Sequence, residues 1–167
     1  MADQETILSL VQELAQELLQ HLGAKAQLTV NPDPTNQAIK VEIETDQPGS
    51  LIGFHGKTLS AFQLLLGLMV YRRLNQWQRL IVDVNGYRQE QQERLRQIAL
   101  NAAQRVKFSG RPVVLSPMTP FERRIIHLTL TDFPGVTTRS QGEGDQRRVV
   151  IEPERESGSD QPTPTKE

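Results

Sequence analysis

The chain has 167 residues, of which 37% are hydrophobic, 5% are aromatic and none is cysteine. This length allows one ordinary domain or two small ones, and the missing cysteine excludes a disulfide scaffold, a thiol nucleophile and thiolate metal sites. The longest apolar run, 64–71, is too short to span a bilayer, and the N-terminus lacks a signal-peptide pattern. We therefore expect a cytoplasmic protein with no membrane insertion.

The net charge of −1 is an average over three unlike segments. Residues 1–48 hold 2 basic and 8 acidic residues, 49–111 hold 10 basic and 3 acidic, and 112–167 hold 7 basic and 9 acidic. A positive middle third is typical of a surface that binds a polyanion such as nucleic acid. A well-solvated helix surface rich in arginine produces the same pattern, so charge alone leaves both interpretations open.

The first half of the chain predicts a mixture of helices and strands. In chain order, the expected elements are a helix over 4–22, strands over 26–30 and 39–45, a helix over 57–75 and a strand over 79–84. The first helix is indicated by apolar residues at helical spacing and ends at Gly23, and the strand 39–45 alternates apolar with charged side chains. Turn-forming residues at 31–36 separate the two strands.

The second half continues in the same mixed pattern. The expected elements are a helix over 87–107, a short strand over 112–115, a helix from 119 to about 130, and strands over 136–140 and 147–151. The first of these helices is expected to bury one face, formed by Leu95, Ile98, Ala99, Ala102 and Val106. A capping box with proline at the first helical position starts the next helix at Thr119. Residues 153–167 lack apolar side chains and predict a disordered acidic tail.

A pair of glycines three residues apart marks the first candidate binding segment. The segment consists of Ile52, Gly53, Phe54, His55, Gly56 and Lys57. Because glycine has no Cβ, such a turn lets a sugar-phosphate chain approach the backbone, and the N–H groups at the next helix start can hold phosphate oxygens. An ordinary turn is the alternative. The pattern matches neither a Walker loop nor a dinucleotide fingerprint, so it gives no support to a site for a nucleoside triphosphate.

An arginine pair followed by a histidine marks the second candidate segment. Arg123, Arg124 and His127 are spaced so that all three are expected on one side of a helix. The opposing core stripe is expected to contain Phe121, Ile125 and Leu128. A guanidinium beside an exposed imidazole suits phosphate contact and base stacking, whereas an ordinary solvated surface is the alternative.

Together these segments resemble the SpoIIIJ-associated protein family (Jag, also called KhpB), which joins a KH domain to an R-3-H domain. The resemblance rests on LIGFHGKTLSAFQLL, DVNGYRQEQQERL, GRPVVLSPMTPFERRIIHLTL and GVTTRSQGEGDQRRVVIEP. It implies an α+β fold, with a type II KH unit (αββααβ) at 1–86 and a small three-stranded R-3-H unit at 87–152. It further implies binding of single-stranded nucleic acid, with RNA as the expected ligand and single-stranded DNA as the alternative, without catalysis, cofactor or metal.

Two departures from the family pattern affect these expectations. Family loops usually carry basic residues between the glycines, whereas this loop has Phe54 and His55, so contact there is expected to rely on Lys57, backbone amides and stacking on Phe54. Longer members have an extra N-terminal domain, and this chain is expected to represent a short form that begins with the amphipathic helix.

Three hypotheses for function follow. The first is an RNA chaperone or post-transcriptional regulator whose RNA lies along the glycine segment and reaches the second segment, with a basic track extended by Arg139, Arg147 and Arg148. The second is a nuclease or phosphoesterase using His55 or His127, which the lack of a carboxylate cluster with metal-ligand spacing disfavours. The third is an adaptor in cell-envelope or cell-division regulation that pairs with a second small KH-domain protein, a partner that the resemblance implies.

Overall fold

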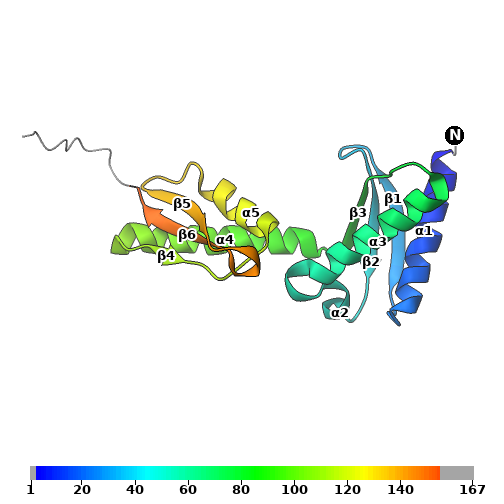
Figure 1. Ribbon diagram of the computed structural model, residues 1–167, viewed down its shortest axis with the longest axis horizontal. Coiled ribbons are helices and arrows are strands. Elements are labelled where there is room, and N and C mark those ends of the chain that lie inside the picture. Colours follow the sequence, from blue (N-terminus) through cyan, green and yellow to red (C-terminus); the bar gives the residue numbers. More distant parts are fainter. Residues whose placement is uncertain (1–2, 155–167) are drawn as a thin grey trace, which may run out of the picture. The chain divides into compact units, whose positions relative to one another are not determined.

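The computed structural model describes residues 3–154, which form two compact units that divide between Glu90 and Gln91 (Figure 1). Each unit combines a three-stranded sheet with helices, which confirms the α+β class. Of the tail predicted to be disordered, Pro153 ends the last strand, and the part after Glu154 lies outside the described residues. Within the described part of the chain, no helix combines the length and hydrophobicity needed to cross a membrane.

The first unit has the αββααβ order that the resemblance implies. Its elements are α1 (Gln4–His21), β1 (Gln27–Asp33), β2 (Ala38–Glu44), α2 (Pro48–Ile52), the turn η1 (Phe54–Gly56), α3 (Lys57–Leu74) and β3 (Leu80–Val84). Strand β2 is central, antiparallel to β1 and parallel to β3, so β3 is an edge strand (Figure 1). Helices α1 and α3 pack against each other and against the sheet.

The core of the first unit follows from the alternation that the sequence predicts. Val41 and Ile43 of β2 and Val82 and Val84 of β3 are almost completely buried, while the charged residues between them are not. Each such side chain contributes about 1.5–3 kcal/mol by leaving water. The facing side of α3 adds Leu59, Phe62, Leu66 and Val70 to the same cluster.

Two local predictions for the first unit were wrong. Strand β1 continues through the proline-containing stretch to Asp33, because β1 is an edge strand, where a missing proline N–H need not break the ladder. The turn is confined to residues 34–37, where Asp33 accepts hydrogen bonds from the backbone N–H and side-chain amide of Asn36. The residue pattern also missed helix α2, which only the resemblance implies, because five residues are too few to show helical periodicity.

The second unit has a sheet of order β4-β6-β5, antiparallel throughout (Figure 1). Its elements are α4 (Tyr87–Ser109), β4 (Val113–Val114), α5 (Pro120–Leu130), β5 (Val136–Gln141), the turn η2 (Gly144–Gln146) and β6 (Arg148–Pro153). Residues 87–90 of α4 belong to the first unit. The predicted capping box is confirmed, since the Thr119 hydroxyl accepts from the Glu122 N–H and the Glu122 carboxylate accepts from the Thr119 N–H.

The faces that these two helices bury differ in part from the prediction. On α4, Ile98 is 41% exposed and Ala103 is buried in its place, beside Leu95, Ala99, Ala102 and Val106. On α5, Phe121 and Leu128 are exposed, and the core stripe consists of Ile125, Ile126 and Leu130. Both stripes have helical spacing, and the position of α5 on the sheet selects between them.

Candidate nucleic-acid interface

Helices α2 and α3 are joined by a glycine loop, Gly53–Gly56, whose backbone requires glycine. Gly53 has φ 70° and ψ −174°, a combination that is essentially restricted to glycine. A Cβ at Gly53 would lie 2.0 Å from the Thr58 hydroxyl oxygen. Gly56 adopts the left-handed conformation with φ 74°, and a Cβ there would lie 3.2 Å from the Tyr87 ring. The two glycines therefore allow a sharp reversal between two helices.

The residues between the two glycines project away from the core. Phe54 is 76% exposed, and its ring meets the exposed His55 ring edge-to-face, with centroids 4.3 Å apart. Lys57, the first residue of α3, is also exposed, while Ile52 before the loop is half-buried. The loop thus places an aromatic ring, an imidazole and an ammonium group around one sharp reversal of the backbone.

The start of α3 adds a favourable electrostatic feature to the loop. Gly56 is its N-cap, no side chain caps the helix there, and its first turn has no acidic residue. The partial positive charge of the helix N-terminus is therefore not offset by a carboxylate. Backbone N–H groups in this position are well suited to phosphate oxygens.

The Arg-x3-His segment on α5 has a different geometry from the one predicted. His127 is half-buried, and its Nδ1 and Nε2 lie 2.7 Å from the Thr138 hydroxyl and 3.0 Å from the Ser140 hydroxyl, both on β5. Burial, reinforced by the charge of Arg123, lowers the pKa of His127 and favours the neutral imidazole. Arg123 donates from Nη1 to the Met118 carbonyl oxygen at 2.8 Å. These two side chains hold α5 in place.

Arg124 differs from Arg123 and His127 in its exposure. It is exposed, and helical spacing places it beside the exposed Phe121 and Leu128. The prediction of an exposed guanidinium beside an exposed imidazole was therefore wrong for Arg123 and His127, which are half-buried, whereas Arg124 is exposed.

Two of the three arginines of the hairpin lie on the opposite face of the sheet from His127. Strand alternation places Arg139 and Arg148 on the face of the sheet opposite to Thr138 and Ser140. Arg139 forms an ion pair with Glu152, and Arg148 donates from Nε to the Gln146 carbonyl oxygen at 3.2 Å. Arg147 is exposed at the end of the turn η2. A basic track through these residues would have to pass around the edge strand β5.

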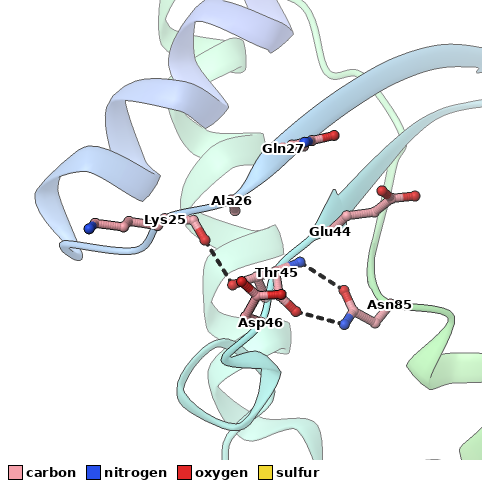
Figure 2. Close-up of a pocket in the computed structure, with 7 residues that line it drawn as sticks. All are labelled: Lys25, Ala26, Gln27, Glu44, Thr45, Asp46 and Asn85. Carbon is pink, nitrogen blue, oxygen red and sulfur yellow. Dashed lines mark hydrogen bonds between the residues drawn. The ribbon is translucent and has the colours of Figure 1, made fainter.

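A polar pocket lies at the end of the first sheet, as Figure 2 shows, and none of the predicted site residues lines it. Its polar groups bind one another: the Thr45 hydroxyl donates to the Lys25 carbonyl oxygen, and Asn85 exchanges two hydrogen bonds with the Thr45 backbone. These bonds fasten the end of β2 to the turn after β3. Residues 3–154 contain no group of three or more histidine, aspartate or glutamate side chains placed to hold a metal ion.

The fold and the site define a chain that joins a KH unit to an R-3-H unit. Residues 9–84 match the family model described as "KhpA/KhpB, KH domain", and residues 93–153 match the model of the R-3-H domain. The relatives include "RNA-binding protein KhpB" of Clostridium symbiosum, 35% identical over 156 residues that cover 93% of this chain and 70% of that protein. Proteins of the same name are 34% identical in Streptococcus pneumoniae serotype 2 (91% of this chain, 46% of the relative) and 32% identical in Bacillus subtilis (81% and 65%).

The chain therefore belongs to the KhpB family, as the resemblance predicted. It spans between about half and about two thirds of the length of these relatives. The relatives are named as RNA-binding proteins and not as enzymes. Residue-by-residue reasoning missed Tyr87 beside the loop and the two hydroxyls that hold His127. The alternation of the stretch TTRS is the signal that could have identified Thr138 and Ser140.

Proposed function

We propose that this chain binds single-stranded RNA through its KH glycine loop and its R-3-H unit, and acts as an RNA chaperone or post-transcriptional regulator in the cytoplasm without catalysing a reaction. Membership of a family whose relatives are named RNA-binding proteins supports the ligand class. The positive segment 49–111 contains the glycine loop and supports a polyanionic ligand. Single-stranded DNA is the competing ligand, and the 2′-hydroxyl distinguishes the two.

The observation that carries this proposal is the geometry of the glycine loop. Its backbone reverses without side chains at Gly53 and Gly56, while Phe54, His55 and Lys57 are exposed around it. We assign phosphate contact to Lys57 and to the backbone N–H groups at the start of α3, and base stacking to Phe54. Ile52 borders the loop and supplies apolar surface.

In the R-3-H unit, the proposed contacts divide between presenting and supporting residues. Arg124 and Arg147 are exposed, and within the described residues neither side chain forms a hydrogen bond or an ion pair. We assign direct phosphate contact to these two arginines. Arg123 and His127 are proposed to support this surface from behind, with His127 orienting the Thr138 and Ser140 hydroxyls. Arg139 and Arg148 belong to the proposed site only if the bound RNA passes around the edge strand β5.

Binding of a fluorescein-labelled, unstructured RNA, followed by anisotropy from 50 to 300 mM KCl, tests the proposal. We expect affinity to fall steeply with salt, and Lys57→Gln to weaken binding several-fold and to lower the salt slope by about 0.7. Lys25→Gln is the matched control, because Lys25 lines the pocket of Figure 2, which contains no proposed site residue. Equal binding by Lys57→Gln and the wild-type chain, or no binding by the wild-type chain, would contradict the assignment.

A second candidate function, an adaptor that pairs with another small KH-domain protein, is favoured by one surface. The outer side of α3 exposes Leu64, Leu65 and Leu68 at 58%, 52% and 48%. Trp77, 58% exposed, extends this surface beside Tyr71, with ring centroids 6.2 Å apart. Contiguous exposed apolar surface of this kind is typical of interaction sites, whereas singly exposed apolar residues are not.

Light scattering on nuclease-treated protein tests the adaptor proposal, with a small KH-domain protein as the added partner. Complex formation that is lost in Leu68→Glu and kept in Ile98→Glu supports it, because Ile98 is a comparably exposed aliphatic residue of the second unit. The absence of any complex, or a complex that nuclease treatment abolishes, counts against it.

A further inference from the structure

The outer edge of β3 is covered by side chains and not by another strand. Val82 of this edge strand directs its N–H to the Gln63 side-chain oxygen at 3.0 Å and its carbonyl oxygen to Arg88 Nε at 2.7 Å. Gln63 comes from α3 and Arg88 from the first turn of α4. An edge strand with unpaired backbone groups is unfavourable unless these groups are satisfied, and this pair of side chains satisfies both.

Arg88 is held in one orientation by three hydrogen bonds. Its backbone N–H donates to Asp83 Oδ1 at 3.1 Å, and its Nη2 donates to the same Gln63 oxygen at 2.7 Å. Together with Nε, this uses the side of the guanidinium that faces the sheet. The N–H groups at the far end of the guanidinium, on Nη1 and Nη2, have no acceptor among the described residues, and Arg88 is only half-buried. A fixed pair of parallel N–H donors of this kind matches a phosphate group.

A series of contacts connects Arg88 to the glycine loop. Tyr87, the preceding residue, lies with its ring against Gly56. The Ser60 hydroxyl donates to the Gly56 carbonyl oxygen at 2.9 Å, and Gln63 follows Ser60 by one turn of α3. The loop, this flank of α3 and the first turn of α4 therefore border the same end of the first unit.

We propose that the first turn of α4 completes the RNA-binding surface of the KH unit, with Arg88 binding a phosphate of the strand held at the glycine loop. The inference rests on the proposed RNA-binding function. It assigns a role to the stretch NGYR, which lies at the end of the KH unit and outside both candidate segments. The charge of Arg88 is presented to the ligand, and Gln63 and Val82 orient it.

Gln63→Glu separates ligand contact from structural support. A carboxylate at this position still accepts the hydrogen bonds of Val82 and Arg88, but it places a negative charge against the guanidinium. We expect this variant to keep the thermal stability of the wild-type chain and to bind single-stranded RNA roughly tenfold more weakly at 100 mM KCl. Arg88→Gln should weaken binding to a similar extent and lower the salt slope by about 0.7, the value for one phosphate contact on a single strand.

Two controls make the result decisive. Gln16→Glu adds the same charge on the exposed side of α1, and Arg94→Gln removes the same charge from an exposed position of α4. Both should bind RNA nearly as the wild-type chain does. If Arg88→Gln weakens binding and Gln63→Glu does not, Arg88 is only a structural residue and the inference is overturned. Wild-type affinity in both, alongside weakened binding by Phe54→Ala, also overturns it and leaves the proposed function intact. If the wild-type chain fails to bind RNA at all, the proposed function itself fails.

Discussion

The glycine loop and the Arg-x3-His segment carry short motifs of similar length, yet the structure uses them in opposite ways. In the loop, the glycines satisfy the backbone and Phe54 and His55 project outward. On α5, Arg123 and His127 turn inward and form hydrogen bonds within their own unit. A motif therefore contains residues that support the local structure and residues that are exposed for ligand contact. Sequence spacing alone does not distinguish the two kinds. We expect loop variants to change binding and variants at His127 to change stability.

The largest expected effect concerns the backbone of the loop. Gly53→Ala combines a glycine-only conformation with a Cβ overlapping Thr58, so the free energy of unfolding of the first unit should fall by about 3–5 kcal/mol. Gly86→Ala is the matched control: φ is also positive, but a Cβ there meets no atom within 4 Å, so the cost should be about 1–2 kcal/mol. Trp77, the single tryptophan, lies in the first unit and reports its unfolding by fluorescence. Equal losses in both variants would show that the Thr58 contact has no part in the effect.

The next largest expected effect is a loss of RNA affinity that leaves the stability of the fold unchanged. Phe54→Ala should weaken RNA binding by about 1–3 kcal/mol through the loss of one stacked base, with unfolding changed by less than about 0.5 kcal/mol. Phe108→Ala, at a residue that is 95% exposed on α4, is the aromatic control and should bind normally. Anisotropy titrations and thermal unfolding of the same samples measure both quantities. A stability loss in Phe54→Ala that matches its binding loss would remove the contrast between the two regions.

His127 should show the reverse behaviour. His127→Ala removes the hydrogen bonds to Thr138 and Ser140 that join α5 to β5, and should destabilise the second unit by about 1–2 kcal/mol. Amide hydrogen exchange of β5 measures this unit separately. His55→Ala, at an exposed histidine in the loop of the first unit, should leave the exchange rates of β5 unchanged. Protection of β5 that survives in His127→Ala would show that the two hydroxyl contacts contribute little.

The smallest effect is on pH dependence. Because burial lowers the pKa of His127 from its ordinary value of 6.5, the unfolded chain binds the proton more readily than the folded unit. Stability from this source is therefore complete above pH 6.5 and decreases as the pH falls through 6.5 towards the lower pKa of the folded unit. The stability difference between the wild-type chain and His127→Gln should shrink over that window. A difference that grows as the pH falls would mean that the folded unit favours the imidazolium.

The sequence predicts most of the helices and strands because capping residues and the spacing of apolar residues set where these elements begin and end. The capping box at Thr119 and the apolar alternation of β2 place those elements correctly. Helix α2 lacks periodicity, but Pro48 at its first turn and Gly53 at its end are signals that could have identified it. The orientation of α5 could not be predicted, because Phe121, Ile125 and Leu128 form an equally regular stripe and only packing on the sheet decides between the two. The inward position of His127 follows from that rotation.

Ultraviolet crosslinking of the full chain to a bound single-stranded RNA, with the crosslinked residues mapped by mass spectrometry, tests the central contrast most directly. We predict crosslinks within residues 52–57, led by Phe54, and none at His127, because its ring nitrogens are engaged with β5. Crosslinks at His127, with none in the glycine loop of RNA-bound protein, would contradict this account.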